Sequence, residues 1–242
     1  MRSSVAGTPA DRGRPPERLH QLLGEGAHVD LLSSSVTTAE QDEEPAHALR
    51  TAETGGVVPR MFVMVGLPAT GKSSRARELA SAWSALRLTP DEWMIPLFGQ
   101  EQPEGKRNVL EGRLIWLALS ALRNGVNVVL DFGVWAKDER SALRALAASV
   151  GASSELVYLH VDEEEQWRRV QARALTDAAT IFEMTRADLD GWRPSFEPPD
   201  ATELETADID PPPAGFDSWE AWVAQWWPTS LPGYGSGRHV LD

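Results

Sequence analysis

The residues of this chain best suited to chemistry form a glycine-rich run that ends in a lysine and two serines. The run reads Gly66-Leu67-Pro68-Ala69-Thr70-Gly71-Lys72-Ser73-Ser74 and contains the pattern G-x-x-x-x-G-K-[ST] of a phosphate-binding P-loop. The glycines let backbone N–H groups curl around a phosphate, and the helix N-terminus that follows adds partial positive charge. Lys72 would reach the β- and γ-phosphates, and the Ser73 hydroxyl suits a Mg²⁺ ligand. We therefore predict that residues 66–74 bind ATP with Mg²⁺, against the alternative of a chance match in a turn.

Two aspartates each follow an apolar segment that reads as a strand. Asp91 comes after residues 86–88, and Asp131 directly follows residues 126–130. Because chemistry in an open parallel sheet takes place outside the carboxyl ends of the strands, Asp91 is predicted to be the general base for an acceptor hydroxyl. Asp131 has the position of a Walker-B aspartate and is predicted to hold Mg²⁺. The alternative for either side chain is an ordinary helix-cap or turn aspartate.

Arginines gather on a predicted helix over residues 163–175. Arg169 and Arg173 are four residues apart and therefore share a helix face. Arginines at this point can clamp the β- and γ-phosphates and stabilise charge in the transition state, so both are predicted to be catalytic. The alternative is a solvated face on which the arginines, Arg168 included, pair with residues 163–165.

The elements that would position these residues alternate between strand and helix. Short apolar runs predict buried strands over residues 61–65, 86–88, 126–130 and 155–161, while amphipathic runs predict helices over 73–86, 106–123, 137–150 and 163–175. This alternation predicts an α/β fold built on a parallel sheet.

The chain outside this core has a different composition. Residues 1–58 are polar and rich in Gly, Pro and acids, which predicts a flexible N-terminal extension, and residues 59–190 form the predicted catalytic domain. Residues 191–242 form an acidic, Pro-containing tail with a helix at about 217–227. Asp217 and Glu220 have capping-box spacing there. One face of this helix carries an apolar stripe formed by Trp219, Trp222, Val223 and Trp226. The stripe predicts that the helix packs against the domain, and the alternative is that it contacts a partner or the substrate.

Composition narrows the classes of protein that this chain can belong to. The 242 residues carry 23 Lys and Arg against 36 Asp and Glu, a net charge of −13, and include no cysteine. Disulfides, thiolate metal sites and cysteine nucleophiles are therefore excluded. Residues 59–176 have a net charge of +1 and residues 177–242 of −10. The acidity argues against a nucleic-acid partner or an anionic membrane but not against ATP. No apolar run has membrane-spanning length, and the N-terminus is unlike a secretory signal, so a cytoplasmic location is expected.

The whole set of motifs resembles the P-loop small kinases that include chloramphenicol phosphotransferase, zeta-toxin-like kinases and the kinase domain of polynucleotide kinase. The resemblance covers residues 59–176 and implies a core of five parallel strands. It also implies that Asp91 is the general base and that Arg169 and Arg173 belong to a lid over ATP. The chain departs from polynucleotide kinase at Thr89-Pro90, where that enzyme has an arginine before the base. The lid region, residues 177–189, is acidic, and both departures argue against a polynucleotide acceptor.

These features favour a kinase that transfers the γ-phosphate of ATP to a hydroxyl of a small molecule, such as a metabolite or an antibiotic. One alternative is a nucleotide-binding switch or accessory ATPase whose tail serves a partner. Another is a toxin-like kinase that acts on a nucleotide sugar. Asp91 discriminates between the first two, because a kinase needs a base near the γ-phosphate and a switch does not.

Overall fold

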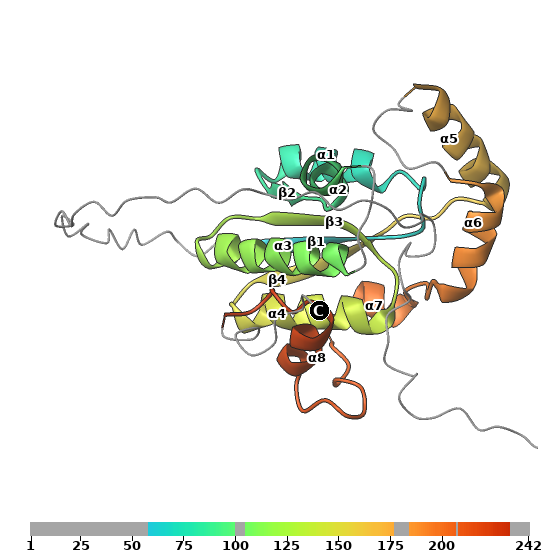
Figure 1. Ribbon diagram of the computed structural model, residues 1–242. Coiled ribbons are helices and arrows are strands. Elements are labelled where there is room, and N and C mark those ends of the chain that lie inside the picture. The colour runs from blue at the N-terminus through green and yellow to red at the C-terminus, as the bar shows by residue number, and fades with distance from the viewer. Residues whose placement is uncertain (1–57, 100–104, 177–183, 207, 233–242) are drawn as a thin grey trace, which may run out of the picture.

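The computed structural model describes residues 58–99, 105–176, 184–206 and 208–232 (Figure 1). Its centre is a parallel sheet in the order β2-β3-β1-β4. The strands are β1 (Arg60–Val65), β2 (Leu86–Leu88), β3 (Val128–Val134) and β4 (Ser153–Tyr158). The predicted α/β parallel fold is confirmed, with four strands in the described ranges where the resemblance implied five. The predicted flexible extension lies, apart from residue 58, outside the described residues.

The central strand β1 is apolar from Met61 to Val65 because it is covered on both sides. Residues 61–65 are all buried, as a continuous apolar run in a parallel sheet requires. Phe62 and Met64 face α1 (Lys72–Ala82), while Met61, Val63 and Val65 face the larger core. Helix α1 ends four residues earlier than the sequence predicted, because the chain turns at Ser84 with a φ of 47°.

The larger core is built on the other face of the sheet by two long helices. These helices are α3 (Lys106–Arg123) and α4 (Lys137–Ser149), and both lie close to their predicted bounds. Their buried leucines pack on β1 and β3. Among the described helices, none is long and apolar enough to cross a membrane.

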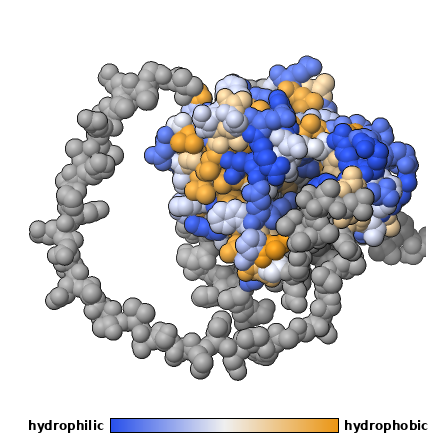
Figure 2. Space-filling model, turned by 90° about the horizontal axis from the view of Figure 1, so that it is seen from above, coloured by the Kyte–Doolittle hydropathy of each residue, from blue (hydrophilic) through white to orange (hydrophobic). Residues whose placement is uncertain are grey.

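Three helices lie at or near the carboxyl edge of the sheet. Helix α2 (Asp91–Phe98) follows β2 directly, and α5 (Glu163–Thr176) and α6 (Arg186–Trp192) stand beyond the strand ends (Figure 1). A 3-10 turn over Arg193–Ser195 continues α6. The side of the molecule that carries α1 and α2 is strongly hydrophilic over the α5 end (Figure 2), which reflects the many charged residues of that helix.

The tryptophan-rich helix near the C-terminus is α8 (Trp219–Trp226), and it packs on the core as predicted. Trp219, Trp222 and Val223 are buried, and Trp227 just after the helix is buried as well. The predicted capping residue is wrong by one position: Ser218, not Asp217, is the N-cap, and its hydroxyl accepts from the N–H of Ala221 at 3.2 Å. The short hydroxyl side chain at the helix boundary satisfies a backbone donor that would otherwise lack a partner.

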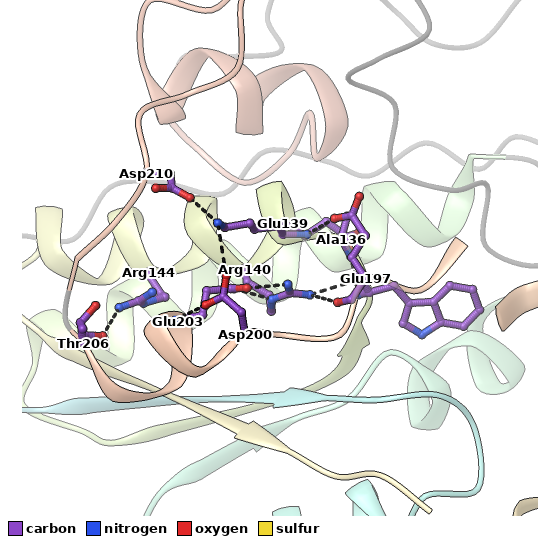
Figure 3. A network of polar contacts seen from close by, with 11 residues as sticks. Ala136, Glu139, Arg140, Arg144, Glu197, Asp200, Glu203, Thr206 and Asp210 are labelled. Atoms are coloured by element: carbon purple, nitrogen blue, oxygen red, sulfur yellow. Dashed lines mark hydrogen bonds and ion pairs between the residues drawn. The ribbon is translucent and has the colours of Figure 1, made fainter. Parts of the chain in front are cut away.

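The segment between the 3-10 turn and α8 is attached to α4 by a buried ion pair (Figure 3). The Nε and Nη2 atoms of Arg140 donate to the two carboxylate oxygens of Glu203, on α7 (Ala201–Glu205), at 2.7 and 2.9 Å. The Nη1 atom of Arg140 donates to the carbonyl oxygens of Trp135 and Glu197, and Arg144 donates to that of Thr206. The acidic segment is therefore fixed to the core by arginines of α4.

Candidate active site

The P-loop joins β1 to α1 and has the backbone shape that its glycines were predicted to allow. Gly66 has a φ of 142°, and a Cβ atom there would lie 2.4 Å from the carbonyl oxygen of Leu159. Gly71 has a φ of 97° and precedes the first residue of α1. Thr70 closes the turn by donating from its hydroxyl to the carbonyl oxygen of Leu67 at 2.9 Å. Lys72 and Ser73 consequently occupy the first turn of a helix, where N–H groups point at an anion.

The Lys72 side chain folds back across the loop that precedes it. Its Nζ atom donates to the carbonyl oxygen of Leu67 at 2.6 Å. On its other side lies Gly133, where a Cβ atom would come within 3.0 Å of the Lys72 Cε atom. The hydrogen bond to Leu67 holds the ammonium group beside the loop, and Gly133 of β3 leaves the space that the side chain occupies, which the sequence did not indicate.

Asp131 is buried next to the P-loop. Burial raises the pKa of its carboxyl above the ordinary 3.8, while a hydrogen bond with Ser73 and the positive charges of Lys72 and Arg87 act in the opposite direction. The Nη1 atom of Arg87 lies 2.9 Å from Asp131 Oδ2. The two predicted metal ligands, Ser73 and Asp131, are therefore neighbours, although the role of each stays a prediction.

The predicted position of Asp131 at the end of a strand is wrong. The strand β3 continues to Val134, and its pairing with β1 is interrupted on the way: Val63 pairs with Leu130, whereas Val65 pairs with Val134. This irregularity contains Gly133, whose φ of 68° suits glycine. The bulge lies beside Lys72, because a Cβ atom on Gly133 would come within 3.0 Å of the Lys72 Cε atom.

The Asp91 carboxylate lies at the same edge of the sheet and is largely exposed. Helix α2 begins at Asp91 with Pro90 as its N-cap, so Asp91 does not cap the helix as the alternative interpretation supposed. Its Oδ1 atom lies 2.9 Å from Nη2 of Arg107, and 66% of its side-chain surface is exposed. Asp91 is also near enough to Asp131 for its negative charge to raise the pKa of that carboxyl further.

Helix α5 contacts the P-loop through the side chains of Arg169 and Gln166. Arg169 donates from Nη1 to the carbonyl oxygen of Thr70 at 3.3 Å, and from Nε to Glu165 at 2.6 Å. Hydrogen bonds from Arg168 and Arg169 lower the pKa of Glu165 to about 2. Both the P-loop contact and the alternative pairing with the acidic first turn are therefore present. Arg173 is exposed on the next turn of α5, and its action on phosphate stays a prediction.

Gln166 is a site residue that sequence reasoning missed. Its Nε2 atom donates to the carbonyl oxygen of Pro68 at 2.8 Å, and the residue is buried. It lies four residues before the buried Val170, so an uncharged polar residue on the apolar side of a highly charged helix was the available signal. Arg87 was also missed, because its partner Asp131 is far away in sequence.

The residues present fit a nucleotide phosphate with a bound Mg²⁺. The tight backbone at Gly66, the first turn of α1 and Lys72 form a cradle for an anion. The Ser73 hydroxyl and the Asp131 carboxylate are the hard oxygen donors that Mg²⁺ prefers. In the described part of the chain, no cluster of three or more His, Cys, Asp and Glu residues offers another metal site.

Replacing Gly133 by alanine tests the contact with Lys72. A Cβ atom at this position would lie 3.0 Å from Lys72 Cε, so the Lys72 side chain must shift by a few tenths of an ångström. We expect ATP affinity to fall about fivefold, equivalent to ~1 kcal/mol. Fluorescence titration with a labelled ATP analogue and Mg²⁺ measures this affinity. The matched control is Gly151→Ala, because Gly151 has a φ of 74° but nothing within 4 Å of its Cβ position. Equal loss of affinity in both variants would show that backbone strain alone is responsible.

The fold and the site define a P-loop nucleotide-binding protein of the α/β class. A family model described as an AAA domain matches residues 61–199, which is more than half of the chain. The chain belongs to this family. The P-loop kinase-like fold that the motifs predicted is thereby confirmed.

Three solved structures show a partly similar arrangement, and two of them are described as a candidate kinase and a gluconokinase. A candidate kinase from Chloroflexus aurantiacus j-10-fl is 19% identical, with 65% of this chain and 81% of that chain covered and a TM-score of 0.47. A gluconokinase from Sinorhizobium meliloti 1021 is 19% identical, with 72% and 90% covered and a TM-score of 0.44. A chain of the Pnkp1/Rnl/Hen1 RNA repair complex is 19% identical, with 59% and 45% covered and a TM-score of 0.45. No curated protein matches the sequence. Similarity at this level identifies no substrate.

Proposed function

We propose that this protein is a kinase that transfers the γ-phosphate of ATP to a hydroxyl group of a small molecule. The observation that supports this most directly is the exposed carboxylate of Asp91, which lies at the same edge of the sheet as the P-loop and Asp131. A protein that only binds or slowly hydrolyses ATP has no need of a base reserved for an acceptor, whereas a kinase does. Because Asp91 is mostly exposed, an acceptor molecule can reach it.

The protein forms no covalent bond to the phosphate in this transfer; it positions the reactants and stabilises the charge that develops on the phosphates. The acceptor oxygen attacks the γ-phosphorus, the bond from that phosphorus to the β–γ bridging oxygen breaks, and ADP leaves. Asp91 takes the hydroxyl proton in this step. Lys72 and Arg169 stabilise negative charge on the phosphates, with Arg173 added if α5 closes on the nucleotide. Mg²⁺ held by Ser73 and Asp131 would neutralise phosphate charge.

The acceptor class is proposed from the sequence and the charge distribution. The chain is acidic overall, and residues 177–242 alone have a net charge of −10, which disfavours a polyanionic acceptor such as a nucleic acid. A small metabolite or an antibiotic with a free hydroxyl suits the site better.

The experiment that tests this function is incubation of the full chain with ATP, Mg²⁺ and a panel of hydroxyl-bearing metabolites, antibiotics and one oligonucleotide. We expect mass spectrometry to find a phosphate-sized mass gain on one small molecule and none on the oligonucleotide. The Lys72→Ala protein is the control, and it should give no product and bind ATP more weakly. ATP consumption without any modified acceptor would favour the ATPase alternative, and unchanged ATP affinity in Lys72→Ala would contradict the P-loop assignment.

A further inference from the structure

We infer that the C-terminal segment, residues 219–230, is part of the catalytic apparatus, because a buried series of three side chains connects it to Asp91. The series consists of Trp227, Glu111 and Arg107, none of which the sequence analysis singled out. Trp227 lies beyond residue 199, where the match to the family ends. The inference rests on the proposed function, since it takes Asp91 as the base, and it assigns the three residues a positioning role.

The three side chains and Asp91 are connected by contacts at hydrogen-bond distances. The indole Nε1 atom of Trp227 donates to Glu111 Oε2 at 3.0 Å. The other carboxylate oxygen of Glu111 accepts from Arg107 Nε at 3.0 Å. The Nη2 atom of Arg107 lies 2.9 Å from Asp91 Oδ1. One carboxylate and one guanidinium therefore lead from the C-terminal segment to the candidate base.

Burial increases along this series as it leads away from the site. Asp91 is exposed, Arg107 is 8% exposed, and Glu111 and Trp227 are 2% and 3% exposed. Interactions between charged groups are stronger and less screened by salt when they are buried. The inner part of the series is thus a rigid support, and its outer end holds a carboxylate that would otherwise rotate freely in water.

The geometry of Arg107 explains how the support acts. A guanidinium is planar with its donors at fixed directions, so binding of Nε by Glu111 sets the direction in which Nη2 points. The direction of Nη2 in turn fixes one oxygen of Asp91. The other carboxylate oxygen of Asp91 is left to accept a proton, and because the side chain is 66% exposed, an acceptor can approach it from solvent.

The C-terminal segment is seated on α3 too closely for the Trp227 contact to shift. Gly112 follows Glu111, and a Cβ atom there would lie 2.5 Å from Thr229 Oγ1 and 3.1 Å from the backbone nitrogen of Ser230. Thr229 also donates from its hydroxyl to the carbonyl oxygen of Val109 at 2.5 Å. The glycine allows this approach within a helix, and the contact fixes Trp227 opposite Glu111.

The test compares three variants by their affinity for ATP and by their turnover, which is the rate of phosphate transfer from ATP with Mg²⁺ to the acceptor that the panel described above identifies. Arg107→Lys keeps the charge but cannot hold both carboxylates in one plane, so turnover should fall about tenfold. Trp227→Phe keeps the ring but removes the N–H donor, and turnover should fall about threefold. The matched control is Trp226→Phe, because the Trp226 Nε1 atom is buried without a hydrogen-bond partner in the described residues. ATP affinity should be unchanged in all three.

Repeating the variants in the Asp91→Asn protein separates positioning from stability. If Arg107 and Trp227 act through Asp91, their substitutions should lower turnover no further once that carboxylate is gone. Full additional loss in that background, or loss in Trp226→Phe equal to that in Trp227→Phe, would overturn the inference. If Asp91→Asn itself leaves turnover unchanged, the proposed function fails instead, so the two failures are distinct.

A second measurement needs no turnover at all. The indole N–H signal of Trp227 in a ¹⁵N-labelled protein is identified by its disappearance in Trp227→Phe. We expect Asp91→Ala, which removes the group that Arg107 binds, to shift this signal and to leave that of Trp226 in place, because coupling through a series of contacts runs in both directions. An unmoved Trp227 signal would show that the series does not reach Asp91.

Discussion

Asp91→Asn is expected to lower phosphoryl transfer by about 10²- to 10⁴-fold, the contribution typical of a general base, while ATP binds as before. Asparagine has nearly the same shape as aspartate and can still accept from Arg107 through its amide oxygen. It cannot take the proton of an attacking hydroxyl. The measurement pairs the rate of product formation with the dissociation constant of ATP, so that chemistry and binding are read separately.

The control for this prediction is Glu78→Gln on α1, which makes the same change of charge at an exposed residue paired with Arg75. We expect wild-type rates for it. Equal rates for Asp91→Asn and Glu78→Gln would remove Asp91 from the mechanism and leave ATP binding or hydrolysis as the function of the site. A parallel fall in ATP affinity in Asp91→Asn would instead mean that Asp91 helps to hold the nucleotide.

The parts of the site that could be predicted from the sequence are those whose geometry is local. The P-loop is a continuous run, and its conformation follows from Gly66, Gly71 and the helix that begins at Lys72. The proximity of Asp91 and Asp131 was also predictable. Asp91 follows β2, and Asp131 lies within β3, three residues before its end, so both are near the carboxyl edge of the parallel sheet, where the strand ends meet.

Contacts between distant segments could not be derived in the same way. Arg87 and Asp131 are 44 residues apart, and Gln166 and Pro68 are 98 apart. A charged or polar residue on a helix or strand reads as solvated unless its partner is known, because most such residues are exposed. The bulge in β3 was missed for a related reason: its location depends on the pairing with β1, and pairing is invisible in one sequence.

The acidic segment after residue 190 also makes contacts with distant residues that its sequence did not predict. Its composition predicted a tail with one docked helix, and α8 was found almost where it was expected. Composition could not show that Glu203 is buried against Arg140. The available signal was on α4, where Lys137, Arg140 and Arg144 repeat at helical spacing and therefore share a face. That face meets the acidic segment (Figure 3).

Glu203→Ala is expected to lower the free energy of unfolding by about 3–5 kcal/mol, because it leaves the Arg140 guanidinium buried without its carboxylate. The Arg140 side chain is only 1% exposed and the Glu203 side chain 7%, so water cannot replace the lost partner. Denaturation in urea, followed by circular dichroism, measures the change. Glu205→Ala is the control, since Glu205 lies two residues further along in the same helix and is exposed.

Glu203→Gln separates the charge of this contact from its shape. The amide keeps one oxygen for Arg140 but presents an NH₂ group where the second oxygen was, so we expect a loss between those of Glu205→Ala and Glu203→Ala. Because the Arg140 Nη1 atom also binds the carbonyl oxygens of Trp135 and Glu197, the arginine cannot simply turn outward to reach solvent. A Glu203→Ala protein as stable as Glu205→Ala would therefore mean that the segment detaches from α4 without affecting the core. In that case α8 and the contacts of Trp227 and Thr229 with α3 would still hold the C-terminal part of the chain to the domain.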